Sequence, residues 1–139
     1  MTRIKYDASL MGYISIFENM TRTKLKDCFL SEELVIFVVQ PNEIAKAIGK
    51  NGQNAKMVER ILKKKIKIVE FSDDVIQFIK NFVFPLKVQE AIVDGNGLVT
   101  LSGGDTSTKS MLIGRNASNL RNTEGIVKRY FPIEKIRVV

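Results

Sequence analysis

The sequence contains no histidine and no tryptophan, and it has one cysteine in 139 residues. Without histidine there is no Ser-His-Asp triad, no Cys-His dyad, no imidazole acid or base and no histidine-ligated zinc. A single cysteine, Cys28, cannot form an internal disulfide or a cysteine-rich metal site, which indicates a reduced, cytosolic protein. We interpret Cys28 as an unreactive strand residue, since no histidine activates it. No paired carboxylates stand out, so we expect a non-enzyme with no catalytic residue, metal or cofactor.

Long apolar runs are also absent. No stretch approaches the roughly 20 apolar residues of a membrane span, and the N-terminal residues 1–7 carry charges where a signal peptide is apolar. We therefore expect a cytoplasmic protein with no membrane partner. The hydrophobic fraction of 45% is enough to build a core, and the length suits one ordinary domain or two very small ones.

Positive charge is in excess. The chain has 22 Lys and Arg against 15 Asp and Glu, a net charge of +7. Such a chain favours a polyanionic partner, because cations that neutralise phosphates release condensed counterions. Residues 1–71 hold 13 basic and 8 acidic side chains, net +5, and residues 72–139 hold 9 and 7, net +2. Nucleic acid is thus the first partner to consider, with the first half dominating.

Hydrophobic periodicity predicts the order helix, strand, strand, helix, helix, strand in each half. The predicted elements are helix 8–20, strands 24–30 and 34–39, helices 44–48 and 53–64 and strand 66–71, then helix 73–84, strands 86–93 and 98–101, a short helix to 113, helix 117–130 and strand 133–139. Strand 34–39 is continuously apolar and is expected in the middle of a sheet. In helix 53–64, Ile61 is placed on the buried face with Val58.

Local signals set several of these boundaries. Residues 94–97, Asp-Gly-Asn-Gly, predict a hairpin turn. Asp105 is the expected N-cap of the short helix that ends at residue 113, and Asp73 or Ser72 that of helix 73–84. Four phenylalanines near the junction of the halves are expected to pack in the core and between domains rather than to stack on bases: Phe71, Phe78, Phe82 and Phe84.

An internal repeat appears at an offset of 65 residues. Residues 48–64 align without gaps on residues 113–129, with seven of 17 positions identical and three more exchanging lysine for arginine. The identical positions of the first copy are Ile48, Gly49, Asn51, Asn54, Glu59, Ile61 and Lys63. Average residue usage gives about one chance identity in 17, so the repeat indicates a duplicated structural unit.

The repeated segment is a helix, a Gly-basic-Asn-Gly/Ala turn and a second helix. A glycine turn allows close backbone approach, and the next helix offers free N–H groups and a positive dipole end to a phosphate. Lys50 and Arg115 add charge at the tip of each turn. Apolar neighbours of the turns would support bases: Ile44, Ala45, Ile48, Ile113 and Leu120. Only unpaired strands offer splayed bases to such a groove.

These residues resemble a known family. The motif and its copy, each inside the same predicted order of elements, are Ile48-Gly49-Lys50-Asn51-Gly52 and Ile113-Gly114-Arg115-Asn116-Ala117. They are similar to two tandem type II KH domains, residues 1–71 and 72–139, and the pair resembles archaeal NusA-like transcription factors. The resemblance implies an α+β fold, with a three-stranded sheet and helices on one face of each domain. It also implies binding of single-stranded RNA and a role in pausing, termination or antitermination by RNA polymerase.

Carried onto this sequence, the resemblance predicts RNA-binding residues in both copies. The backbones of the two turns and the basic residues would hold phosphates, while apolar residues face bases and amides add polar contacts. The predicted set is Ile44, Ile48, Gly49, Lys50, Asn51, Gly52, Gln53, Asn54 and Lys56, with Ile113, Gly114, Arg115, Asn116, Ala117, Asn119, Leu120 and Arg121. Ala117 departs from the family motif, which has glycine there: alanine would restrict the approach of a ligand to the backbone unless this position has helical dihedrals, which would accommodate it. A monomer is expected.

Two rival functions stay open. One is a scaffold of the same fold that docks on RNA polymerase or a ribonucleoprotein with little direct RNA contact. The other is a nucleotide switch built on Lys109 and Ser110, because residues 103–110 come one residue short of a P-loop. Thr108 stands where that motif has glycine, and 139 residues leave little room for the larger parallel sheet it needs. We therefore interpret residues 103–110 as a turn and a capped helix start.

Overall fold

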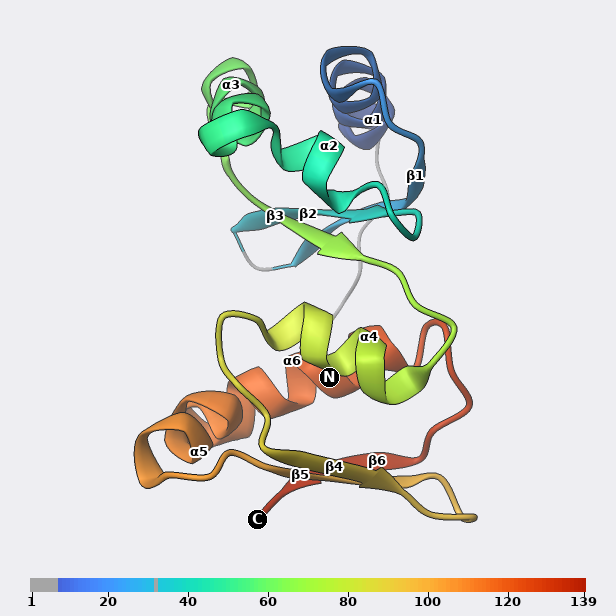
Figure 1. The fold of residues 1–139 in the computed structure, drawn as a ribbon, viewed down its shortest axis with the longest axis vertical. Helices are drawn as coiled ribbons and strands as arrows, with labels where there is room; N and C mark the ends of the chain where they lie inside the picture. Colours follow the sequence, from blue (N-terminus) through green and yellow to red (C-terminus); the bar gives the residue numbers. More distant parts are fainter. Residues whose placement is uncertain (1–7, 32) are drawn as a thin grey trace. The chain divides into compact units, whose positions relative to one another are not determined.

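The computed structural model describes residues 8–31 and 33–139 and divides the chain into two compact units, with the boundary between Ser72 and Asp73 (Figure 1). We call residues 8–72 the N-terminal unit and residues 73–139 the C-terminal unit. Each unit is a mixed α and β structure with one three-stranded sheet. Within each unit the helices lie on one side of the sheet, as predicted (Figure 1).

The N-terminal unit has the predicted order of elements, with a 3-10 turn added between its second and third helices. The elements are α1 (Ala8–Thr21), β1 (Leu25–Ser31), β2 (Leu34–Val39), α2 (Ile44–Ile48), η1 (Lys50–Gly52), α3 (Gln53–Leu62) and β3 (Lys65–Glu70). The apolar strand β2 is central, as expected, because it pairs antiparallel with β1 and parallel with β3.

One face of this sheet forms the core of the N-terminal unit. Side chains alternate between the faces of a strand, so Val35, Phe37 and Val39 of β2 share a face. All three are buried in one cluster with residues of all three helices: Leu10, Phe17, Ala47 and Val58. The rings of Phe17 and Phe37 stack with centroids 4.2 Å apart. Burial of these side chains fixes α2 and α3, and hence the turn between them, on the sheet.

Cys28 belongs to the same core. Its side chain is 1% exposed, and burial, with a smaller contribution from Asp27, raises the pKa of the thiol to about 12. A thiol with so high a pKa is protonated at neutral pH, and the thiolate is the nucleophilic form. The interpretation of Cys28 as an unreactive strand residue is confirmed.

The C-terminal unit repeats the order of the N-terminal unit. Its elements are α4 (Val75–Val83), β4 (Glu90–Val93), β5 (Leu98–Ser102), α5 (Thr106–Ile113), η2 (Arg115–Ala117), α6 (Ser118–Val127) and β6 (Lys135–Val138). Strand β5 is central, antiparallel to β4 and parallel to β6. The buried residues include Phe78, Ile79, Val99, Leu101, Leu112, Ile126, Val127 and Ile136.

Aspartates define the turn and the helix starts of this unit. The Asp94 carboxylate accepts from the backbone N–H groups of Asn96 and Leu98 and closes the predicted hairpin turn. Asp105 caps α5 as predicted, accepting from the N–H of Thr108 at 2.6 Å. The expected cap of α4 was wrong: Asp74, one position later than Asp73, accepts from the N–H of Ile76 at 3.1 Å.

The ends of some elements differ from prediction. Helix α6 ends at Val127, because the N–H groups of Arg129 and Tyr130 bond three residues back and tighten the chain into a 3-10-like turn. Strand β4 begins at Glu90 rather than residue 86. Phe78 is buried, but Phe84 is 68% exposed, so its expected place in the core was wrong. No helix of the described residues is long and apolar enough to cross a membrane.

Candidate functional site

The turn between α2 and α3 has an unusual backbone. Gly49 has φ 80° and ψ 170°, Asn51 has φ 57°, and Gly52 has φ 73° with ψ 14°. These positive φ angles favour glycine and, to a lesser extent, asparagine. The N–H of Gly52 donates to the carbonyl of Gly49 at 3.1 Å, which closes the turn. We call residues 49–52 the first loop.

The corresponding turn of the C-terminal unit, residues 114–117, has the same backbone. Gly114 has φ 75° and ψ 176°, Asn116 has φ 54°, and Ala117 has φ 61° with ψ 23°. The N–H of Ala117 donates to the carbonyl of Gly114 at 3.2 Å. Ala117 therefore lies in the left-handed region, and the right-handed helical dihedrals that would accommodate alanine are not found. We call residues 114–117 the second loop.

An asparagine side chain closes each loop from within. The Nδ2 atom of Asn54 donates to the carbonyl of Lys46 at 3.0 Å, and that of Asn119 donates to the carbonyl of Met111 at 2.8 Å. Both carbonyls belong to the last turn of the preceding helix, where the helix leaves carbonyls without partners. Sequence reasoning missed this role, although the asparagine recurs at the same place in both copies.

The first glycine of each loop makes room for that asparagine. A Cβ at Gly49 would lie 2.8 Å from Cγ of Asn54, and one at Gly114 would lie 2.6 Å from Cγ of Asn119. A side chain at either position would displace the amide from its carbonyl partner. The repeated Gly and Asn, five residues apart, are thus one structural device. It holds the loop backbone in a fixed shape without using any side chain at the tip.

The tips of both loops are exposed and basic. Lys50 and Asn51 are exposed in the first loop, and Arg115 and Asn116 in the second. Neither α3 nor α6 has a side-chain N-cap; the first N–H group of each helix, at Gln53 and Ser118, donates to the carbonyl of Lys50 and Arg115. A helix N-terminus without a side-chain cap, with its positive dipole end and a nearby cation, suits an anion such as a phosphate.

The other predicted polar residues lie just beyond the loops. Gln53 is exposed at the start of α3, and Lys56 follows one turn later. Asn119 and Arg121 are exposed at the start of α6. The predicted loop and polar residues of each copy are therefore brought together on one turn and the start of the helix after it.

The apolar residues predicted beside the loops are only partly exposed. Ile48 is 37% exposed, Ile44 packs against the core of the N-terminal unit, and Ile113 and Leu120 are half-buried. Sequence reasoning missed larger exposed residues on α3. The expectation that Ile61 is buried was wrong, since its side chain is 52% exposed.

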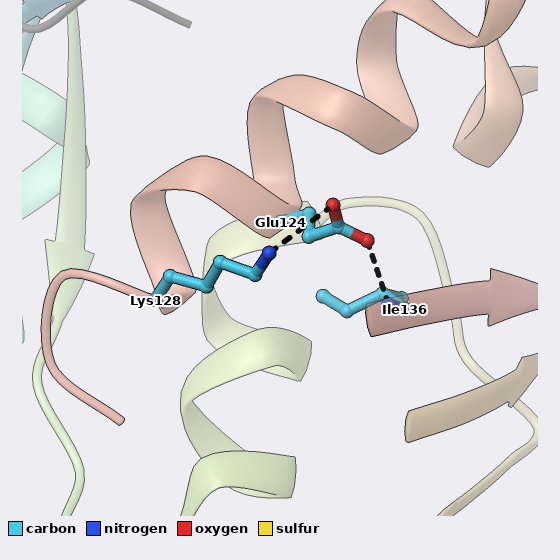
Figure 2. Close-up of polar contacts among 3 residues, drawn as sticks. All are labelled: Glu124, Lys128 and Ile136. Atoms are coloured by element: carbon cyan, nitrogen blue, oxygen red, sulfur yellow. Dashed lines mark hydrogen bonds and ion pairs between the residues drawn. The ribbon is translucent and has the colours of Figure 1, made fainter. Parts of the chain in front are cut away.

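The repeated glutamate is structural. The Oε2 atom of Glu59 accepts from the N–H of Ile66 at 3.2 Å, and Oε2 of Glu124 accepts from the N–H of Ile136 at 2.8 Å. Figure 2 shows the second of these bonds, together with the ion pair between Glu124 and Lys128 at 3.8 Å. Each glutamate ties the helix after its loop to the second residue of the next strand, which fixes the direction of the helix.

Comparison with known proteins agrees with this geometry. The family model of the NusA-like second KH domain matches residues 19–74. The probable transcription termination protein NusA of Methanococcus vannielii is 34% identical over 99% of this chain and 80% of its own length. The protein of the same name from Methanocaldococcus jannaschii is 30% identical over 100% of this chain and 77% of its own.

A solved structure is similar over nearly the whole chain. The crystal structure of APE1850 superposes with a TM-score of 0.75 at 27% identity, covering 96% of this chain and 100% of that one. The similarity to the archaeal relatives spans both units and both loops. The chain therefore belongs to the NusA-like family of proteins.

Proposed function

We propose that the chain forms two tandem type II KH domains, residues 1–71 and 72–139, that bind single-stranded RNA without catalysis. It acts as a cytoplasmic monomer in transcription elongation, termination or antitermination, with RNA polymerase as its protein partner. The observation that carries this proposal is the recurrence of one loop backbone, with a cation at its tip, in two units of the same topology. The archaeal relatives, which are probable transcription termination proteins by name, support the role in transcription.

In each loop the backbone N–H groups and the basic side chain hold phosphates. Lys50 serves in the first loop and Arg115 in the second. Ile48 supports a base beside the first loop, and Ile113 beside the second. The first loop contributes more to affinity, because the N-terminal half carries the larger positive charge.

The test is fluorescence anisotropy with single-stranded RNA, duplex RNA and single-stranded DNA of matched sequence over a salt series. The variant combines Lys50→Asp with Asn51→Asp, and it keeps the loop backbone because aspartate also tolerates a left-handed conformation. We expect tight, salt-sensitive binding of single-stranded RNA by the wild type and a loss of more than about tenfold in the variant.

A matched control exists in α4. Lys80→Asp with Asn81→Asp makes the same two substitutions, with the same change of net charge, away from both loops. Affinity close to wild type is expected from this control once circular dichroism shows it folded. An equal loss in both variants would contradict a site at the first loop. Unchanged binding in the loop variant would favour the scaffold that docks on RNA polymerase.

A further inference from the structure

Two rows of exposed side chains run along α3, away from the first loop. Lys56 and Arg60 lie on the helix, and Lys64 follows two residues after its last residue, Leu62, beyond the left-handed C-cap Lys63; we call these three residues the cationic row. Met57 and Ile61, 39% and 52% exposed, form the apolar row. Each apolar residue directly follows a cationic one, about 100° around the helix, so the two rows lie side by side.

The cations of α3 have no acidic partner among the residues that the structure describes. No acidic side chain in the described ranges, 8–31 and 33–139, forms an ion pair with the cationic row. The one carboxylate of the helix, that of Glu59, accepts a hydrogen bond from the N–H of Ile66 in β3 instead of pairing with a cation of the row. Lys63 and Lys65, both exposed, add further positive charge where the row ends.

The apolar row lies on the side of the helix that meets α2. Ile61 follows Asn54 by seven residues, about two turns, so the two point in nearly the same direction. The amide of Asn54 reaches the carbonyl of Lys46 in α2. Ile48, the last residue of α2, is 37% exposed. The apolar row therefore begins near the apolar residue beside the first loop, and the cationic row lies outside it.

The duplicated helix α6 lacks the exposed apolar row and the middle cation of the cationic row, although Arg121 and Arg129 stand at the positions of Lys56 and Lys64. Asn122 stands at the position of Met57, and Gly125 at that of Arg60. Ile126, which corresponds to Ile61, is fully buried. Lys128, which corresponds to Lys63, forms an ion pair with Glu124 (Figure 2). The exposed apolar row and the cation at Arg60 are thus not requirements of the fold.

We infer that α3 extends the RNA site of the first loop. A strand held at the loop continues along the helix, with its phosphates on the cationic row and its bases against the apolar row. The inference rests on the proposed function, since the loop must hold the strand first. Lys56 and Arg60 are four residues apart on the helix, a rise of about 6 Å. The N-terminal unit then contacts more than the four nucleotides that a KH loop clamps.

The test compares a 4-nucleotide and a 12-nucleotide oligouridine by fluorescence anisotropy over a salt series. One variant combines Arg60→Ala with Lys64→Ala, and a second combines Met57→Ser with Ile61→Ser. Lys80→Ala with Lys87→Ala removes the same charge elsewhere and is the control; both of these lysines are exposed. Circular dichroism checks the fold of each variant.

The cationic-row variant should bind the 12-mer at least about fivefold more weakly than the control does, with the slope of log K against log salt smaller by about 1.4, or 0.7 for each lost phosphate contact. The apolar-row variant should weaken the 12-mer with little change in slope. Both should bind the 4-mer like wild type. A 12-mer bound equally by the cationic-row variant and the control would overturn the inference while leaving loop binding intact. Wild type that binds neither oligomer would overturn the proposed function itself.

Discussion

Ala117 occupies in the second loop the left-handed conformation that Gly52 occupies in the first, with φ angles of 61° and 73°. An L-residue with a Cβ pays about 1–2 kcal/mol for this conformation, whereas glycine adopts it freely. The second loop thus keeps the shape of the first at a cost in stability. The shape is held by the glycine and asparagine pair, Gly114 and Asn119.

Two separate substitutions, Gly52→Ala and Ala117→Gly, should change the free energy of unfolding in opposite directions. Gly52→Ala should lower the free energy of unfolding by about 1 kcal/mol through backbone strain alone, because the added Cβ would meet only Cε of Lys56 at 3.9 Å. Ala117→Gly should raise it by up to about 1 kcal/mol, since relief of strain exceeds the entropy that glycine adds to the unfolded chain. Urea unfolding of the two variants measures both. A destabilised Ala117→Gly protein would contradict the strain at this position.

The asparagine that closes each loop should be needed for stability and for loop shape. Asn54→Ala removes the hydrogen bond to the carbonyl of Lys46 and should cost about 1 kcal/mol. Hydrogen exchange of the Gly52 amide, which bonds within the loop, should become faster.

Asn119→Ala is the matched variant in the C-terminal unit. It should accelerate exchange of the Ala117 amide and leave the Gly52 amide unchanged, because the two loops lie in separate units. Unchanged exchange in both variants would mean that the loops hold their shape without the asparagines.

The free energy of unfolding should fall in acid, because two aspartates of the C-terminal unit, Asp94 in the hairpin turn and Asp105 at the start of α5, become protonated. Hydrogen bonds from the backbone and side chain of Thr108 lower the pKa of Asp105, and those from Leu98 and Asn96 lower that of Asp94. A pKa that is lower in the folded than in the unfolded protein gives stability that is present above the unfolded value, about 3.9, and lost as the pH falls through the folded value.

The variant Asp105→Asn keeps an acceptor at the cap but cannot titrate. Wild type should be the more stable of the two at pH 7, and the difference should shrink below about pH 4. Thermal unfolding midpoints between pH 2 and pH 7 measure it. Parallel curves for the two proteins would show that Asp105 does not titrate with folding.

Much of the architecture follows from local patterns in the sequence. The repeated order of elements, the central place of residues 34–39, the hairpin turn at residues 94–97 and the cap at Asp105 were all predicted and are all present. Each depends on a strong local signal, such as a continuous apolar strand or a turn rich in glycine. Asp74 was missed because Asp73 offers the same capping group one residue earlier.

The features that were not predicted depend on tertiary contacts. Nothing in the local sequence shows that the amide of Asn54 turns back to a carbonyl eight residues earlier. Ile61 fits the buried stripe of a helix by periodicity, yet its side chain is 52% exposed. Val58, not Ile61, is the residue of α3 that is buried in the core cluster. Alanine gives no sequence signal for a positive φ, so Ala117 could not be expected in the left-handed region.

Nuclear magnetic resonance of the amide groups during a titration with single-stranded RNA shows whether both loops bind it. The largest shift changes should fall on residues 49–53 and 114–118, and they should appear at lower RNA concentration in the first loop. Shift changes confined to other surfaces, with both loops unmoved at saturating RNA, would contradict the proposed RNA sites.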